Sequence, residues 1–259
     1  MKVLVFDTET TGLIKNYNAS MEDSSKWPHV LQLSFIVFDT NTKEILDYSD
    51  RIIRLADNVD ISPESIAIHQ ITRERSNREG IPIRQALLEF IEAMKGVDIL
   101  VAHNLIFDKT LLQVELCRHK LIANFISAAA AADAVADADA VAQTLLAPKE
   151  YCTMQESITL CKIPNPNKKY AMSNQYKWPR LNELHKQLFK VEPNGTHNAI
   201  ADVMICLRCY IYMNYQYDIA TDEDVKIIFR NLYANYCGAP VIIEPKSQSQ
   251  SQSEVLLCE

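Results

Sequence analysis

The sequence predicts an α/β protein built on a mixed β-sheet, and two observations indicate this class. Three apolar segments separated by turn signals open the chain, at residues 3–6, 30–38 and about 44–54, which is typical of an antiparallel meander. Segments of helical periodicity then flank a further buried strand at residues 97–102, and this order implies at least one parallel pairing. We therefore expect a mixed sheet flanked by helices, in one domain over residues 1–240.

Capping signals and apolar periodicity predict the helices around this sheet. Ser62 and Pro63 are typical of the N-cap and the first position of a helix, so a short helix is expected to end near Gln70. In the last predicted helix, Asp222 lies in the first turn, where an acidic side chain suits the helix dipole. The other helices are predicted at residues 83–94, 105–121, 181–189, which is short, 198–215 and 222–236.

Two segments depart from this pattern. Residues 126–147 are rich in alanine, the best helix former, so we expect an insertion there that is helical or partly ordered. Its aspartates are interpreted as a solvated acidic face. Residues 241–259 contain a Ser-Gln repeat typical of a flexible tail, and the apolar residues 255–257 near its end fit either a docking peptide or a plain tail.

Composition limits the class of function. The chain has 259 residues, 48% of them apolar, which is enough for one sizeable core. The net charge of −7 argues against a broad electrostatic grip on nucleic acid. This net charge is compatible with an acidic enzyme that binds phosphate groups through bound metal ions.

The setting expected for the protein is the cytoplasm. Seven cysteines, an odd number with irregular spacing, suit a reducing compartment, and Cys206 and Cys209 are interpreted as core residues of a helix. No apolar run approaches the roughly 20 residues that cross a bilayer, so no membrane contact is expected. A strand that begins at residue 2 leaves no space for a secretory signal.

Two carboxylates end the first strand. Asp7 and Glu9 follow the apolar run directly, and residues two apart on a strand point to the same face. Side by side, they repel each other unless they share a proton, meet a basic partner or bind a cation. The rest of the sequence indicates which of these applies.

A third carboxylate follows the strand at residues 97–102. His103 and Asn104 come next, Asn104 is a natural N-cap, and Asp108 starts the second turn of the helix it caps. Ligands of open α/β sheets bind at this end of the strands.

A fourth carboxylate and a histidine repeat the arrangement further on. His197 is expected in the loop before the helix at residues 198–215, with Gly195 leaving it freedom to swing, and Asp202 faces inward from the first turn. Four carboxylates form an oxygen-rich site for hard cations such as Mg²⁺ or Mn²⁺. Two such ions can clamp an in-line phosphoryl displacement, with His197 as the proton acceptor.

Three ordered segments, residues 6–12, 104–108 and 197–202, resemble the exonuclease motifs of the DEDDh (DnaQ-like) family, which includes the proofreading epsilon subunit, ribonuclease T and oligoribonuclease. The resemblance covers roughly residues 1–215 and extends to residues 62–72 and 151–154. It implies a ribonuclease H-like fold and 3′→5′ removal of nucleotides, with release of 5′-monophosphates.

The resemblance also implies roles for individual residues. The implied catalytic and metal-binding residues are Asp7, Glu9, Asp108 and Asp202, with two divalent cations and with His197 as general base. The implied substrate contacts are Thr10, Leu13, His103, Asn104 and Phe107.

Three questions stay open at this level. The substrate is the 3′ end of single-stranded DNA, as in proofreading beside a polymerase, or of RNA, because no 2′-hydroxyl reader can be recognised from the residues. A non-catalytic module that binds a polymerase is the alternative from another class. The loop at residues 164–179 mixes lysines with aromatic residues, which fits a single-strand contact as well as a plain polar loop.

Overall fold

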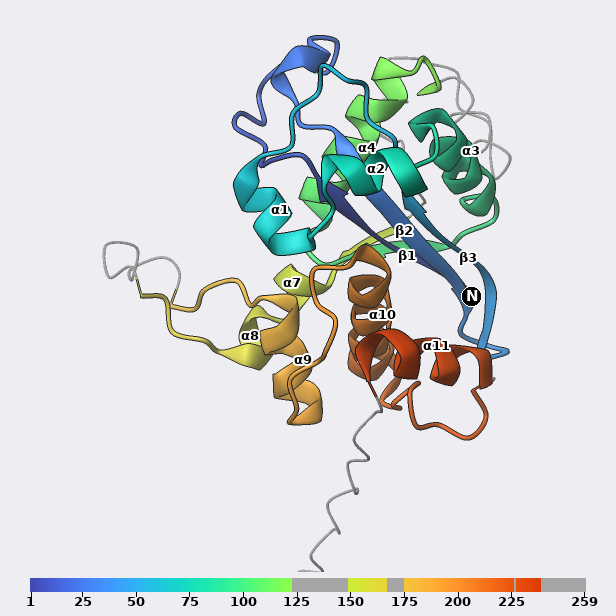
Figure 1. The fold of residues 1–259 in the computed structure, drawn as a ribbon. Helices are drawn as coiled ribbons and strands as arrows, with labels where there is room; N and C mark the ends of the chain where they lie inside the picture. The colour runs from blue at the N-terminus through green and yellow to red at the C-terminus, as the bar shows by residue number, and fades with distance from the viewer. Residues whose placement is uncertain (123–148, 167–174, 226, 239–259) are drawn as a thin grey trace, which may run out of the picture.

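A computed structural model describes residues 1–122, 149–166, 175–225 and 227–238 of the chain (Figure 1). The predicted alanine-rich insertion at residues 126–147 and the predicted tail at residues 241–259 lie outside these ranges. So does the middle of the loop at residues 164–179.

The core of the molecule is a five-stranded mixed sheet with the strand order β3-β2-β1-β4-β5. The pairs β1–β2 and β2–β3 are antiparallel, whereas β1–β4 and β4–β5 are parallel. The mixed sheet and its meander are therefore confirmed, and the strand β5 is an addition that the sequence pattern did not predict. The strands are β1 (Lys2–Thr10), β2 (Val30–Asp39), β3 (Glu44–Ile52), β4 (Ile99–Ala102) and β5 (Lys149–Cys152).

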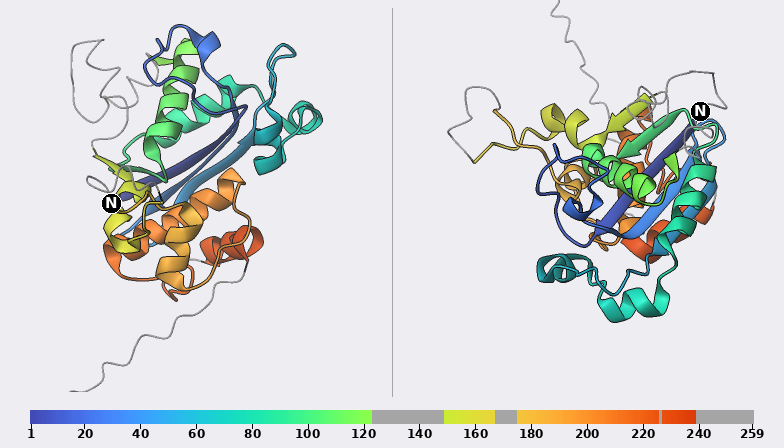
Figure 2. Two further views of the ribbon diagram at one scale, coloured as in Figure 1. Left: turned by 90° about the vertical axis from the view of Figure 1, so that its left-hand side faces the viewer. Right: turned by 90° about the horizontal axis from the view of Figure 1, so that it is seen from above.

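Helices cover both faces of the sheet (Figure 2). Ser62 caps the first helix as predicted, since its side chain accepts a hydrogen bond from the Ser65 amide. The helices α2, α7 and α8 were not predicted. The helices are α1 (Pro63–His69), α2 (Arg73–Glu79), α3 (Ile83–Ala93), α4 (Leu105–Arg118), α7 (Thr153–Glu156), α8 (Ile158–Cys161), α9 (Leu181–Phe189), α10 (Ala199–Tyr215) and α11 (Ile227–Cys237), with a short 3-10 turn at Ser24–Lys26.

The predicted start of the last helix was wrong. Asp222 lies before α11 and does not occupy its first turn, because its carboxylate accepts hydrogen bonds from Lys43 Nζ at 3.0 and 3.2 Å. Asp224 accepts a further bond from the same ammonium group at 3.3 Å. These long-range ion pairs with Lys43 therefore hold both acids before the helix, although the local sequence favoured a place for Asp222 in its first turn.

The alternation of side chains along β1 divides the core into two layers. Leu4 and Phe6 pack with α3 and α4, whereas Val3 and Val5 pack with α9, α10 and α11 on the opposite face. By the same alternation, the odd-numbered residues at the end of β1 point toward α10 and the even-numbered residues point toward α4.

The cysteines of α10 are core residues, as predicted. Cys206 and Cys209 are buried in the layer between the sheet and α10. Burial raises the pKa of both thiols. Neither belongs to a group of possible metal ligands within the described ranges.

A buried polar network ties α10 to its neighbours. The guanidinium of Arg208, 1% exposed, donates to both carboxylate oxygens of Asp218 at 2.8 and 2.6 Å and to the Tyr233 hydroxyl at 2.8 Å. His185 Nδ1 donates to the Val191 carbonyl, so its Nε2 is the acceptor that faces Tyr233 and Arg208. This arrangement requires a neutral imidazole.

We expect His185 to make stability depend on pH. Burial, and then the charge of Arg208, lower the pKa of His185 from 6.5 to about 4. Because the pKa of His185 is lower in the folded chain than in the unfolded chain, protonation favours the unfolded chain. The contribution of neutral His185 to the free energy of unfolding is therefore complete above pH 6.5 and is lost as the pH falls toward 4. The loss is about 2 kcal/mol between pH 6.5 and 5. Urea unfolding of the wild type and His185→Gln should show a free-energy difference that narrows over this interval; a difference independent of pH would contradict it.

Candidate metal centre

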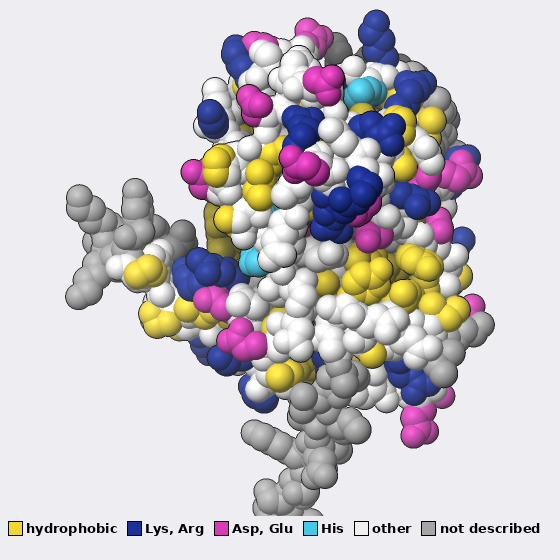
Figure 3. All heavy atoms as spheres, in the orientation of Figure 1, with side chains coloured by type: hydrophobic (Ala, Val, Ile, Leu, Met, Phe, Trp, Pro, Cys, Tyr) yellow, Lys and Arg dark blue, Asp and Glu magenta, His cyan; other side chains and the backbone are white. Residues whose placement is uncertain are grey.

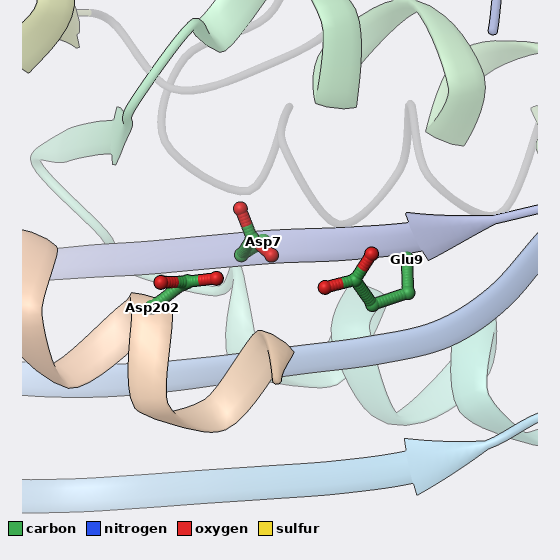
Figure 4. A group of neighbouring side chains, drawn as sticks. All are labelled: Asp7, Glu9 and Asp202. Atoms are coloured by element: carbon green, nitrogen blue, oxygen red, sulfur yellow. The ribbon is translucent and has the colours of Figure 1, made fainter. Parts of the chain in front are cut away.

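Three carboxylates from two distant parts of the chain converge at the end of β1. Asp7 and Glu9 come from β1 and Asp202 comes from the first turn of α10. One carboxylate oxygen of each lies within 4.8 Å of the others, and Figure 4 shows the three side chains in the space between strand and helix. Within the part of the chain that the structure describes, no other group of three or more His, Cys, Asp or Glu residues meets this condition.

Local structure explains why these side chains meet. Asp7 and Glu9 are the odd-numbered residues that β1 turns toward α10, as the sequence predicted. Asp202 is fixed by the loop before its helix, since the His197 amide donates to Asp202 Oδ2 at 2.9 Å. The Asn198 carbonyl accepts the Asp202 amide at 3.0 Å and so starts the helical ladder.

Asp108 reaches the same region from the opposite face of the sheet. It lies on α4, is 3% exposed, and its Oδ1 accepts bonds from the Thr8 amide at 3.0 Å and the Thr8 hydroxyl at 2.7 Å. Thr8 is the even-numbered residue between Asp7 and Glu9. The structure thus places Asp108 beside the three converging carboxylates but anchors it on β1.

The four carboxylates destabilise one another's charged forms. Burial, followed by the charges of the neighbouring carboxylates, raises the pKa of Asp7 well above its ordinary value and that of Glu9 to about 8. Burial likewise raises the pKa of Asp108 to about 7 although the Thr8 bonds oppose it, and that of Asp202 to about 7 against the His197 amide. The charges that perturb these four groups are all acidic.

The donor set fits a divalent cation. Carboxylate oxygens are the ligands that Mg²⁺ and Mn²⁺ prefer, and a cation would offset the repulsion that raises these pKa values. Among the described residues, the charges that act on Asp7 and Glu9 are all acidic, so no basic partner offsets the repulsion between these two carboxylates. A bound cation therefore suits this cluster best.

His197 lies on the loop that leads into α10. Its side chain is exposed and its backbone has a φ of 70°, while its amide holds Asp202 as described above. Gly195 was expected to leave His197 freedom to swing, and the structure gives the glycine a further reason, because a Cβ at this position would lie 2.2 Å from the Tyr236 carbonyl oxygen. Close packing against α11, together with a φ of 75°, explains the glycine.

The predicted substrate residues beside β1 form a turn. The Thr10 hydroxyl donates to the Gly12 carbonyl at 2.8 Å, and Thr10 is buried. Leu13 is 79% exposed just after this turn. Leu13 is therefore accessible to a bound strand, whereas the Thr10 hydroxyl has a bond within the chain.

The predicted substrate residues beside α4 occupy structural positions. His103 Nε2 donates to the Pro179 carbonyl at 3.0 Å, and its Nδ1 lies 2.9 Å from the Thr153 hydroxyl, so both ring nitrogens have partners. Asn104 precedes α4 in the left-handed conformation, φ 72°, without the side-chain cap that the sequence predicted. Phe107 packs against the apolar core of the α3 and α4 layer.

Two residues beside the site were not assigned a role from the sequence. His69 is buried, its Nε2 donates to the Thr10 carbonyl at 3.2 Å, and its Nδ1 accepts the Ile71 amide at 3.0 Å, so it positions the turn after Glu9. Tyr17 is 50% exposed, and partial burial, followed by the charge of nearby Asp108, raises its pKa. His69 lies within residues 62–72, which the family resemblance covers, so that resemblance was the signal that could have found it, whereas no sequence signal marked Tyr17.

Comparisons with known proteins agree with this geometry. Residues 4–130 match the family model RNase_T, described as an exonuclease, and a search of curated proteins returned no match. Among solved structures, zinc-bound E. coli exonuclease I with single-stranded DNA has 14% identity and a TM-score of 0.55, covering 83% of this chain and 41% of that chain.

Two further exonuclease I structures give the same result. The E. coli protein with a dT13 oligonucleotide has 14% identity and a TM-score of 0.56, covering 83% of this chain and 42% of the other. The protein from Methylocaldum szegediense has 14% identity and a TM-score of 0.53, covering 89% and 43%. The chain spans less than half the length of these exonucleases, and at such identity the likeness shows the fold.

The fold and the acidic cluster define an exonuclease domain of ribonuclease H-like architecture. The resemblance to DEDDh-type, DnaQ-like exonucleases is supported by the exonuclease family model, which matches residues 4–130, and by the exonuclease I fold. No helix among the described residues is both long and apolar enough to span a bilayer.

Proposed function

We propose that the chain is a metal-dependent 3′→5′ exonuclease that hydrolyses the last phosphodiester bond of a single-stranded nucleic acid. The observation that carries this proposal is the convergence of Asp7, Glu9 and Asp202, with Asp108 beside them. The exonuclease family model and the exonuclease I fold support it. The products would be nucleoside 5′-monophosphates.

The four carboxylates would hold two divalent cations, Mg²⁺ or Mn²⁺. When bound, such ions activate water and neutralise the charge that develops on the phosphate. The chain's own contribution is to fix the ligands: β1 orients Asp7 and Glu9, Thr8 holds Asp108, and the His197 amide holds Asp202.

His197 would act as the general base. It is exposed on a loop two residues before α10, and an imidazole is the side chain most often used as a general base. The hydrogen bond from its backbone amide to the Asp202 carboxylate keeps His197 beside the proposed metal ligands.

The single strand would reach the site past exposed apolar side chains. Leu13 and Tyr17 follow β1, and Trp178, 62% exposed, precedes Pro179, whose carbonyl is bonded to His103. Aromatic rings at such a position can stack on bases without regard to sequence.

We expect Trp178→Ala to weaken binding of a single strand. Loss of one stacking contact costs about 1–3 kcal/mol, or about 5- to 150-fold in affinity. Fluorescence anisotropy with a labelled oligonucleotide in Ca²⁺ measures this. Tyr48→Ala, which removes a 51% exposed ring from the edge strand β3, is the matched control and should leave affinity unchanged. Equal affinities of wild type and Trp178→Ala would remove Trp178 from the proposed path.

The substrate class is tested with matched oligonucleotides. We propose DNA, because E. coli exonuclease I forms complexes with single-stranded DNA and with a dT13 oligonucleotide. DNA and RNA of one sequence, labelled at the 5′ end, should both shorten from the 3′ end only with Mg²⁺ or Mn²⁺, and DNA should shorten faster. EDTA should stop the reaction. Faster shortening of RNA would assign the chain to RNA trimming, and no shortening of either would leave the binding module as the function.

Proofreading beside a polymerase is the finer form of this proposal. It predicts that a mismatched 3′ end in a duplex is removed faster than a paired one, since a frayed end resembles a single strand. Equal rates on both duplexes would argue against it.

A further inference from the structure

A cavity of about 380 Å³ lies apart from the acidic cluster, in the layer formed by α3 and α4. The loop after β3 supplies one wall, with Ile53, Leu55 and Val59, and the end of α4 supplies the other, with Glu115. This volume is in the range of small-molecule pockets, and the apolar wall suits a flat ring.

Glu115, which lines the cavity, has one buried carboxylate oxygen without a hydrogen-bond donor. Glu115 is 1% exposed, and its Oε1 accepts bonds from the Val30 amide and from Arg118 Nη1. Its Oε2 is buried and receives no hydrogen bond, and His119 Nε2 stands 3.5 Å from it. A buried acceptor left without a donor is costly, so a ligand N–H group would be bound favourably here.

The rim of the cavity is basic. Arg118 already pairs with Glu115, which leaves the charges of Arg54 and Arg84 for a ligand; both side chains are exposed. Arg84 donates from Nη1 to the His119 carbonyl at 2.9 Å, which orients it beside the opening. Figure 3 shows lysine and arginine side chains gathered over α2 and its surroundings, on the same half of the molecule. Arginine forks of this kind favour a phosphate or carboxylate.

We propose that this cavity, the Glu115 pocket, binds a nucleoside 5′-monophosphate with an amine-bearing base. The base would lie against the apolar wall and donate to Glu115 Oε2, and the phosphate would meet Arg54 and Arg84. A free amine would not use the basic rim, and inorganic phosphate would not use Glu115. The requirement for both groups selects the nucleotide.

The pocket adjoins the turn that follows Glu9. Glu115 holds the amide of Val30, which pairs with Thr10 across the two strands, and the His29 carbonyl accepts the Thr11 amide at 2.9 Å. A nucleotide in the pocket would therefore lie next to the turn that carries Thr10 and Leu13, two of the implied substrate contacts. That the nucleotide bound here is the 5′-monophosphate released by the reaction is the one part of the inference that rests on the proposed function.

Titration calorimetry of the full chain tests the pocket. Asp7→Asn protein in EDTA is used, so that binding at the acidic cluster is weakened and no hydrolysis is required. The probes are AMP, purine riboside 5′-monophosphate, which lacks the amine, adenosine and inorganic phosphate. AMP should bind saturably, and each of the others about tenfold or more weakly.

Two tryptophan variants locate the binding. Ala56 is exposed and lines the cavity, so Ala56→Trp should fill the opening and abolish AMP binding. Asn58 is exposed on the same loop but does not line the cavity, so Asn58→Trp should bind AMP as before. Absence of saturable AMP binding, undiminished binding by Ala56→Trp, or equal affinity for AMP and purine riboside 5′-monophosphate would overturn the proposal. Because no nucleotide release is measured, failure here leaves the proposed exonuclease activity standing.

Discussion

Replacing Asp7 by asparagine is expected to slow nucleotide release by about 10³-fold or more while the chain stays folded. Asp7 lies at the centre of the acidic cluster, within reach of Glu9 and Asp202 and close enough to Asp108 to feel its charge. An amide in its place removes one negative ligand, and loss of a group that acts on transition-state charge typically costs 10²–10³ or more. Single-turnover shortening of a labelled oligonucleotide in Mg²⁺ measures the effect.

The same substitution is expected to stabilise the metal-free protein. The like charges around Asp7 oppose one another, so Asp7→Asn should raise the free energy of unfolding in EDTA by about 1 kcal/mol, or about 2–4 °C in melting temperature. Mg²⁺ should raise the melting temperature of the wild type by mass action and that of the variant much less. Thermal unfolding with EDTA and with Mg²⁺ gives both quantities.

Asp47→Asn is the matched control for these two measurements. Asp47 is exposed on the edge strand β3, far in sequence from the cluster, and its loss also removes one negative charge. It should change neither the rate of release nor the response to Mg²⁺. Full activity of Asp7→Asn, or an equal Mg²⁺ response in all three proteins, would contradict a metal centre at this position.

Part of this site could be predicted because local rules determine it. Residues two apart on a strand share a face, and a carboxylate in the first turn of a helix points along its start, so Asp7, Glu9 and Asp202 were expected to be functional from the sequence. The attachment of Asp108 to Thr8 spans 100 residues, and that of His69 to Thr10 spans 59. Contacts of this kind depend on how β1, α1 and α4 pack, which periodicity does not specify.

The same limit applies to the fold. The meander and the long helices carry strong patterns, whereas β5 is only four residues long and pairs on one side with a strand as short as itself. Without the tertiary partner, residues 149–152 have no pattern that separates a strand from a loop. The start of α11 was wrong for a related reason, since the ion pairs from Lys43 outweigh the helix preference of the acids before it.

Arg208 shows the largest gap between sequence and structure, because it is a charged residue in the middle of a buried helix. Its neighbours in α10, from Val203 to Ile211, are buried apolar residues and cysteines. Its guanidinium lies 3.9 Å from the Phe189 ring centroid and is paired with both oxygens of Asp218. The network joins α9, α10 and the segment before α11, so it fixes the helix that carries Asp202.

Arg208→Met is therefore expected to lower the free energy of unfolding by about 3–5 kcal/mol. Methionine keeps much of the volume of the side chain, but it leaves the Asp218 carboxylate, 13% exposed, without its charged partner, which is the costly part of breaking a largely buried ion pair. Urea unfolding at pH 7 measures the loss. Arg51→Met, which breaks the more exposed pair between Arg51 and Glu89, is the matched control and should cost less than about 1 kcal/mol.

A second substitution separates the lost pair from a general defect of packing. If the unpaired carboxylate causes the instability, Asp218→Asn in the Arg208→Met background should restore part of the lost stability, although Asp218→Asn alone should be destabilising. The melting temperature and the rate of nucleotide release should recover together, because both depend on the placement of α10. A double variant no more stable than Arg208→Met would show that the guanidinium stabilises the core through its ring contacts with Phe189 and Tyr233.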